Sequence, residues 1–510
     1  MNHFFKIYFW QFVSIFFNFA AIFIVTPFLT SNQTIYGIYT LVIASYMFLS
    51  YADFGFLGAG MKFASEYHAQ NNLKEEIKVI GFTGFIFLVF VLFYAVGVFF
   101  LAFNPDILIS SLANEKERNI ASKLLSILAL FSPVFVMQRI VQIIFAIRLR
   151  DYIFQKIIIV SNVIKILFAI LIFSNKSYPI VTFFLFSQVC TLLAVLIGLF
   201  IAKNLFGYEF KLFFNCFKFS KEIYLKVKKI AFVSIFLTLC WILFYELDPF
   251  VISKLLGSKH LAIFAIGFTL MEYFRSIFGI IFSPFIAKFN HFIGLKDFNG
   301  LHNLFKKVLI MTLPLTVFPV LAVSITIKSF IYCWVGEQYA DSVPIAKFLV
   351  LSFLFSFLSS PTGILIMAYE KAKLLYITSA MLPLIYWLGV FFTFQFIGLQ
   401  AFSDFKVVAF FIIAIIYLNL IATILKEQFW PFLVSLVLPA ILPVLFIFGI
   451  TFLTKNYLPI EKSIFNLFIY FVYTGLVIMF AFIVYYFSSF EFKKNINKII
   501  SDYYFVNPKL

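Results

Sequence analysis

The sequence predicts an all-α integral membrane protein with about fourteen transmembrane helices. Of its 510 residues, 63% are hydrophobic and 12% are charged, whereas a soluble domain carries about 25% charged residues. Apolar runs recur along the chain at about 20 residues, the length that crosses roughly 30 Å of hydrocarbon. Composition and run length together exclude a soluble fold.

Fourteen stretches have the required length and apolar character. They cover residues 7–29, 36–60, 79–103, 120–146, 156–174, 180–202, 230–256, 260–287, 305–328, 343–368, 375–397, 404–425, 432–454 and 463–488. The first stretch is longer than the apolar core of a signal peptide, and no small-residue cleavage pattern follows it. We therefore expect it to be a membrane helix.

Internal repetition predicts how the helices are grouped. At an offset of 222 residues, Pro27-Phe28 aligns with Pro249-Phe250, and Ala146 aligns with Ala368. Six helices per repeat is an even number, which predicts two lobes in the same orientation, related by a pseudo-two-fold axis along the membrane normal. The predicted domains are an N-terminal lobe, a basic connector, a C-terminal lobe, helices 13 and 14, and a tail, at 1–202, 203–229, 230–425, 426–488 and 489–510.

The net charge of +17 has a simple explanation in a membrane protein. If the N-terminus is cytoplasmic, most of the 39 Lys and Arg residues fall on the cytoplasmic side, as the positive-inside rule requires. We therefore expect both termini in the cytoplasm and no nucleic-acid partner. In the connector, Phe and Lys residues interleave, which indicates either an amphipathic helix on anionic lipid or an ordinary positive-inside loop.

Cations inside the predicted spans are the strongest candidates for a substrate site. An ionisable group in hydrocarbon costs about 2.5 to 3.5 kcal/mol by insertion scales, so it marks a bundle interior or a cavity. Arg275 lies mid-helix with Glu272 one turn earlier, and Lys165 follows a Ser-Asn pair on one helix face. Arg139 is nearer a helix end, from which its side chain can reach the interface. For the Arg275–Glu272 pair the alternative is a structural ion pair or a contact between helices.

Four carboxylates share the predicted membrane region: Asp248, Glu272, Glu246 and Asp53. Asp248 precedes Pro249, and a proline at this point predicts a kink with a freed backbone carbonyl. A carboxylate at this depth can bind a proton or Na⁺ and couple a transport cycle to an ion gradient. The alternative is a salt bridge to a cation on another helix. We expect no resident cofactor, and coupling to H⁺ or Na⁺ stays open.

Enzymatic motifs are missing from the sequence. The four cysteines have neither metal nor disulfide spacing, and no GxxxxGK or HExxH motif occurs. No segment between the predicted spans is long enough to house a soluble catalytic domain. We therefore expect no enzyme and no metal site. The alternative, if the protein is an enzyme, is a membrane-embedded polysaccharide polymerase or glycosyltransferase.

Short motifs stand near the ends of several predicted helices. They are Tyr36-Gly37, Asp53-Phe54-Gly55 and Lys62 in the first half, and Asp248, Leu256-Gly257, Pro284, CWVGEQY (333–339) and MAYEKAK (367–373) in the second. In these motifs the chain resembles the multidrug/oligosaccharidyl-lipid/polysaccharide (MOP) exporter superfamily, and within it the Wzx-type O-antigen flippases. Glu337 and Glu370 depart from the pattern, since the family usually has a smaller residue and a glycine there.

The resemblance implies a flippase of the bacterial inner membrane. Its substrate would be a polyprenyl-diphosphate-linked oligosaccharide repeat unit for O-antigen or lipopolysaccharide, moved to the outer leaflet by alternating access. Membrane lipids and polysaccharide polymerase machinery would be its partners. A diphosphate cannot cross hydrocarbon unaided, so Arg275, Lys165 and Arg139 would line a cationic path. The alternative within the superfamily is an ion-coupled MATE-like drug exporter, which usually has twelve helices.

Overall fold

The computed structural model describes residues 2–110, 112, 114–174, 178–369 and 372–506. Helices make up nearly all of this part of the chain, and no strand occurs in it, which confirms the all-α prediction. Residues 370 and 371 of the MAYEKAK stretch, and residues 507–510 of the predicted tail, lie outside the described residues. The chain forms two compact units, Met1–Ala262 and Ile263–Leu510.

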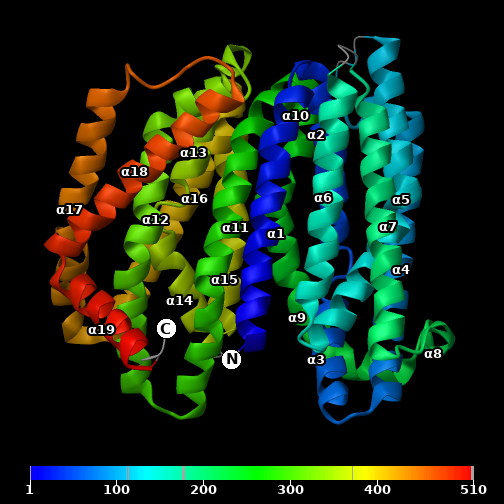
Figure 1. Ribbon diagram of the computed structural model, residues 1–510, viewed down its shortest axis with the longest axis horizontal. Coiled ribbons are helices and arrows are strands. Elements are labelled where there is room, and N and C mark those ends of the chain that lie inside the picture. The colour runs from blue at the N-terminus through cyan, green and yellow to red at the C-terminus, as the bar shows by residue number, and fades with distance from the viewer. Residues whose placement is uncertain (1, 111, 113, 175–177, 370–371, 507–510) are drawn as a thin grey trace. The chain divides into compact units, whose positions relative to one another are not determined.

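The described residues of the first unit form ten α-helices and three short turns of other helix types. Figure 1 labels the α-helices. They are α1 (Asn2–Leu29), α2 (Gln33–Phe48), η1 (Leu49–Tyr51), α3 (Phe56–Ala69), α4 (Leu73–Phe103), η2 (Pro105–Ile107), α5 (Glu115–Ile147), α6 (Asp151–Phe173), α7 (Ile180–Phe206), α8 (Phe210–Cys216), α9 (Lys221–Trp241), η3 (Ile242–Glu246) and α10 (Asp248–Leu256). Among these, η3 is π-helical, while η1 and η2 are 3₁₀ turns.

The next helix, α11 (Ser258–Gly294), begins in the first unit and continues into the second. The remaining elements belong to the second unit. They are α12 (Phe298–Trp334), η4 (Glu337–Tyr339), α13 (Ser342–Leu351), α14 (Ser356–Ala368), α15 (Ala372–Ile397), η5 (Gly398–Gln400), α16 (Ala401–Leu425), η6 (Lys426–Gln428), α17 (Phe429–Thr454), α18 (Ile464–Ser488) and α19 (Phe490–Val506).

Ten of the described helices are long and apolar enough to cross a membrane, or up to twelve if each of two bent helix pairs is one span. All fourteen predicted stretches fall on helical segments. However, α1 is not among them, because its described apolar part, Val13–Leu29, is too short, and α15 with α16 is counted as one stretch, Lys373–Leu425. The protein is a multi-pass membrane protein, and the number fourteen stays a prediction.

Three predicted spans are broken, and the sequence predicted a kink in one of them, at Pro249. The stretch 36–60 divides into α2, η1 and α3. The stretch 230–256 divides into α9, η3 and α10 with a bend of 42°, and 343–368 divides into α13 and α14 with a bend of 46°. Hydropathy hardly changes across these breaks, so it could not reveal them. The kink predicted at Pro249 is confirmed, because the bend comes directly before α10, and Pro249 lies in the first turn of that helix.

Close packing fixes α3 against α4 in the first unit. A Cβ at Gly60 would lie 2.5 Å from the Cγ2 of Thr83, so only glycine permits this approach. The turn between the two helices ends at Asn72, whose Oδ1 accepts a hydrogen bond from the backbone N–H of Glu75 at 3.2 Å. This N-cap satisfies a donor that the first turn of a helix leaves free. As a result α3 and α4 form a hairpin.

The two broken stretches of the first unit lie side by side. α3 packs against α9, η3 contacts α2, and α10 packs against α2. At one end the ring of Phe56 stacks on Tyr224 at 6.4 Å between centroids, and at the other Phe48 meets Phe250 edge to face at 5.0 Å. The break between α2 and α3 therefore lies beside the π-helical turn η3.

The second unit is built around α12. Its buried apolar side chains pack with those of α14, α16, α17 and α18 in one core. Within that core the hydroxyls of Thr326 and Tyr470 are 2.9 Å apart, a hydrogen bond that joins α12 to α18. The C-terminal helix α19 packs against α12 and α18 and buries Phe492.

The boundary between the compact units falls at a different place from the predicted connector. The units divide after Ala262, so α9 and α10 fold with the first unit. The predicted connector ended at residue 229 and the predicted C-terminal lobe began at 230, so that boundary falls within α9 and places α10 in the lobe. Their contacts along α2 and α3 explain the grouping. The predicted lobes and their pseudo-two-fold axis stay predictions.

Candidate functional site

The break between α2 and α3 places a carboxylate inside a membrane span. Phe54 and Gly55 have positive φ angles of 46° and 79°, which end the helical path. The Oδ2 of Asp53 accepts a hydrogen bond from the backbone N–H of Leu57 at 3.1 Å, so Asp53 caps the first turn of α3. A Cβ at Gly55 would lie 2.3 Å from the Cβ of Ser234 on α9, so glycine also permits this helix contact.

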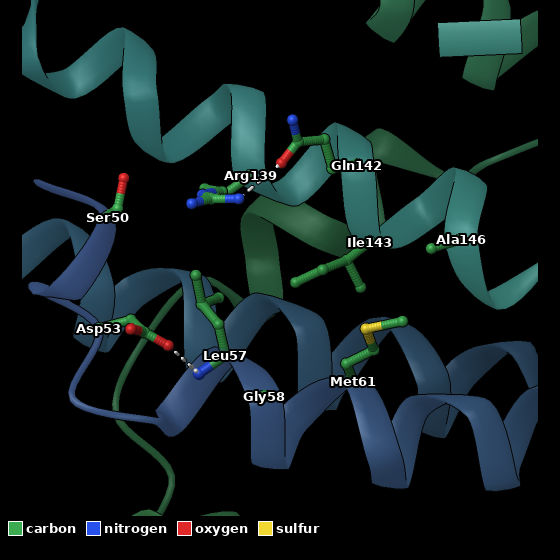
Figure 2. A pocket seen from close by; sticks show the side chains of 9 residues that line it. All are labelled: Ser50, Asp53, Leu57, Gly58, Met61, Arg139, Gln142, Ile143 and Ala146. Carbon is green, nitrogen blue, oxygen red and sulfur yellow. Dashed lines mark hydrogen bonds between the residues drawn. The ribbon is translucent and has the colours of Figure 1, made fainter. Parts of the chain in front are cut away.

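A cavity of about 280 Å³ opens beside this break. Its lining comes from η1, the Asp53 turn and α3 on one side and from α5 on the other: Ser50, Asp53, Leu57, Gly58, Met61, Arg139, Gln142, Ile143 and Ala146. Figure 2 shows the Arg139 guanidinium extending from α5 toward the side on which Ser50 and Asp53 lie. The cavity thus combines a cation, a carboxylate and an amide with an apolar wall.

Two neighbours orient the Arg139 side chain. Its Nη1 donates a hydrogen bond to the Oε1 of Gln142 at 3.1 Å, one turn further along α5. Its guanidinium carbon lies 5.1 Å from the ring centroid of Phe135, within the range of a cation–π contact. Asp53, Tyr46 and Tyr51 are close enough to Arg139 to interact with it electrostatically. A guanidinium held in this way presents further N–H donors to an anion.

A hydrogen-bond chain links the break to η3. The Tyr51 hydroxyl donates to the Oε1 of Glu246 at 2.8 Å and accepts from the Nε1 of Trp241 at 3.0 Å. Glu246 is 5% exposed and is the last residue of the π-helical turn. Single-turn π-bulges in helices are frequent at functional sites. The two helix interruptions are therefore joined through one tyrosine.

Asp248 is fully buried at the first turn of α10. It follows the bend after Glu246 directly and precedes Pro249. In membrane proteins a buried carboxylate beside a helix break is a candidate binding position for an ion or a proton.

Lys165 lies on α6 of the same unit, outside the cavity. Its Nζ donates a hydrogen bond to the Oγ1 of Thr191 at 3.1 Å, which joins α6 to α7. One turn earlier the Nδ2 of Asn162 donates to the Oδ1 of Asn18 at 2.5 Å, which joins α6 to α1. The polar stripe predicted on this helix therefore contacts both neighbouring helices, as interhelical hydrogen bonds in membranes do.

Arg275 and Glu272 form an ion pair on α11 in the second unit. The two side chains are three residues apart on one helix face and are 20% and 29% exposed. This is the pairing that their spacing predicted. The Arg275 guanidinium is therefore held beside the Glu272 carboxylate of the same helix.

Asp53 and Arg139 therefore share one cavity, and Tyr51 connects its edge to Glu246. Asp248 stands two residues beyond Glu246. Lys165 belongs to a separate polar contact of the first unit, and the Glu272–Arg275 pair belongs to the second unit. The functional roles predicted for all seven residues stay predictions.

Sequence reasoning missed several polar residues. Tyr51 carries no charge, so the intramembrane charges that the sequence shows did not point to it. Glu76 and Arg148 form a buried ion pair at 2.7 Å that joins α4 to the end of α5. Lys406 on α16 is fully buried, with its Nζ 4.2 Å from the ring centroid of Tyr386. Its position two residues inside a predicted span was the available signal.

Fold and cavity together define a helical multi-pass membrane protein with broken helices at a polar site. No protein-family model matches the chain, and no curated protein matches it significantly. Solved structures do share the fold. Lipid II flippase MurJ, in an inward closed conformation, superposes with a TM-score of 0.65 and 14% identity over 93% of this chain and 98% of that one.

Two further solved structures share the fold. An inward-facing multidrug resistance MATE family transporter of the MOP superfamily gives a TM-score of 0.59 at 14% identity, over 81% of this chain and 96% of that one. A MOP superfamily transporter from Pyrococcus furiosus gives 0.55 at 14% identity, over 83% and 94%. At this identity the likeness establishes the fold, which is the fold of MOP superfamily transporters. The fold that the resemblance implied is confirmed.

Proposed function

We propose that the protein is a MOP-type flippase for polyprenyl-diphosphate-linked oligosaccharides. The observation that carries the proposal is Arg139, a guanidinium on a cavity at a broken membrane helix. The shared fold with lipid II flippase MurJ supports it, because that protein is a flippase.

The cavity residues suit a diphosphate attached to sugars. Arginine binds phosphate oxygens through two parallel N–H donors, which a lysine cannot do. The Gln142 amide and the Ser50 hydroxyl supply neutral hydrogen-bond partners of the kind that sugar hydroxyls need. Before substrate binds, Asp53 offsets the charge of Arg139. An incoming diphosphate competes with that carboxylate for the guanidinium.

The adjacent acids supply a means of ion coupling. Glu246 and Asp248 are buried beside the bend between η3 and α10. Binding of H⁺ or Na⁺ at either carboxylate would neutralise it and favour a different packing of the two broken helices, as alternating access requires. Lys165 in the first unit and Arg275 in the second would supply further cations for the head group.

The cellular setting follows from the substrate class. The flippase would work in a bacterial cytoplasmic membrane with both termini in the cytoplasm. It would deliver repeat units for O-antigen or another surface polysaccharide to polymerase machinery, and it would not itself be an enzyme.

A MATE-like drug exporter is the second candidate. The observation that favours it is the set of three carboxylates in the membrane region of the first unit, Asp53, Glu246 and Asp248. These acids would suit an organic cation. The fold shared with a MATE family transporter is equally compatible with this function.

A vesicle assay separates the two candidates. Purified protein is reconstituted with a fluorescent polyprenyl-diphosphate oligosaccharide, and the fraction reaching the opposite leaflet is followed with an impermeant quencher. We expect translocation by the wild type and about a tenfold or greater loss in Arg139→Gln, because a hydrogen-bonded charge contributes about 1.5 to 3 kcal/mol. The control Arg118→Gln removes an exposed arginine from the first unit. Transport of an organic cation dye instead, with no lipid movement, would overturn the proposal in favour of the exporter.

A further inference from the structure

Exposed lysines and exposed apolar side chains gather on the segment from the end of α7 to the start of α9. We call this set the connector surface. Its members are Lys203, Leu205, Lys211, Phe214, Lys218, Phe219, Lys221, Leu225 and Lys226, all of them exposed. The four apolar side chains are between 47% and 60% exposed. The surface lies outside the cavity that contains Arg139.

The contacts of α8 place it at one edge of the apolar part of α4. Lys78 is the last charged residue of α4, and the rest of that helix to Phe103 is uncharged. A Cβ at Gly81 would lie 2.9 Å from the backbone oxygen of Cys216, and the Phe85 ring meets Phe217 at 5.9 Å between centroids. Since α4 has 31 residues, its length of about 46 Å exceeds the hydrocarbon thickness of about 30 Å. The α8 segment therefore meets α4 where charge gives way to hydrocarbon.

Successive residues of α8 have opposite surroundings. Phe213 is 1% exposed and packs with Phe217 inside the unit, whereas Phe214 is 60% exposed. Phe219 touches Phe82 at 5.9 Å between centroids but remains 56% exposed. One set of side chains anchors the segment on α4, and the other projects outward. An outward phenylalanine at the hydrocarbon boundary is suited to lipid, because a solvated loop gains nothing from it.

The charge of the connector surface is strongly positive. Within it, Lys226 donates to the Oε1 of Glu222 at 2.9 Å, and this hydrogen bond lowers the pKa of the Glu222 carboxyl, so the two charges offset each other. Glu209 is the one other acid of the segment 203–228. The negative charge of Glu209 is outweighed by the four remaining lysines of the surface, Lys203, Lys211, Lys218 and Lys221.

We infer that the connector surface binds the headgroups of anionic phospholipids, with Phe214 and Phe219 inserted at the acyl boundary. Basic side chains near an anionic leaflet each contribute about 1 kcal/mol of attraction, which corresponds to about a fivefold gain in binding per lysine. The apolar anchors supply the second signal that stable interfacial binding needs. The surface would attach this part of the first unit to the lipid headgroups, independently of the substrate that the cavity binds.

Lipid counting on the intact protein tests this inference. The full chain in detergent is mixed with equal amounts of phosphatidylglycerol and phosphatidylcholine, and native mass spectrometry counts the bound molecules of each. The test variant carries Lys211→Gln, Lys218→Gln and Lys221→Gln. The control variant removes three exposed lysines elsewhere, with Lys116→Gln, Lys123→Gln and Lys259→Gln. A second test variant carries Phe214→Ser and Phe219→Ser.

We expect the wild type to prefer phosphatidylglycerol, the lysine variant to lose that preference by about fivefold or more, and the control variant to keep it. The phenylalanine variant should lose bound lipid of both kinds. Equal loss in the control and test variants would overturn the inference. So would stronger retention of soluble polyglutamate than of phosphatidylglycerol by the wild type, because that result assigns the surface to an acidic protein.

Discussion

The Tyr51 hydroxyl donates a hydrogen bond to Glu246 at 2.8 Å across a separation of 195 residues in the chain. It joins two helix interruptions, η1 after α2 and η3 after α9. In a membrane, irregular backbone is tolerated where protein or a water-filled cavity surrounds it. Each interruption is therefore supported by the other, and the cavity containing Arg139 opens beside the pair.

Removing the Tyr51 hydroxyl should destabilise this junction. Tyr51→Phe leaves a buried carboxylate with one fewer donor, so the free energy of unfolding should fall by about 1.5 to 3 kcal/mol. Denaturant unfolding in detergent measures the change. Tyr39→Phe is the control, since Tyr39 also lies on the α2 segment and its ring packs against Phe184. If the two variants unfold alike, the bond has no structural role.

The turn at Gly55 should not accept a side chain. Gly55→Ala has to adopt a φ of 79° and place its Cβ 2.3 Å from that of Ser234, so we expect a loss of about 1 to 3 kcal/mol. Adding Ser234→Gly should recover part of the loss. The control Gly97→Ala lies within α4 with open space around it and should stabilise the protein by about 0.5 to 1 kcal/mol. A tolerated Gly55→Ala would mean that the turn is not fixed as described.

Removing one partner of the buried Glu76–Arg148 ion pair should destabilise the protein. Arg148 also lies over the rings of Phe206 and Tyr208, at 5.2 and 5.5 Å from their centroids, so Arg148→Met should destabilise the first unit by about 3 to 5 kcal/mol. The double variant with Glu76→Gln should recover much of this. Arg118→Met breaks the exposed Asp106 pair and should change stability by at most about 1 kcal/mol. Equal losses in the two single variants would show that burial does not matter here.

The Glu272–Arg275 pair can be assigned a role by a double-mutant cycle. If the pair is only structural, Glu272→Gln with Arg275→Gln should restore both stability and transport. If Arg275 contacts substrate, the double variant should regain stability but not transport. We expect the second result, with lipid-linked repeat units left on the cytoplasmic leaflet. Unchanged surface polysaccharide in Arg275→Ala would contradict the role assigned to Arg275.

The sequence was sufficient to predict the helical membrane fold, because run length and hydropathy report directly on membrane spans. It did not reveal the break at residues 49–55, since Asp53, Phe54 and Gly55 barely alter the hydropathy of a 25-residue window. It showed Arg139 and Asp53 as separate charges, but their shared cavity depends on how α5 packs against α3. The contact of Tyr51 with Glu246 depends on tertiary structure alone.

Binding of the head group by Arg139 is the central claim, and affinity measures it most directly. A short-chain, water-soluble prenyl-diphosphate oligosaccharide is titrated into the purified wild type, Arg139→Lys and Arg139→Gln. We predict saturable binding by the wild type, weaker binding by Arg139→Lys because one donor fork is lost, and a reduction of about tenfold or more in Arg139→Gln. Equal affinity for all three proteins would contradict the account.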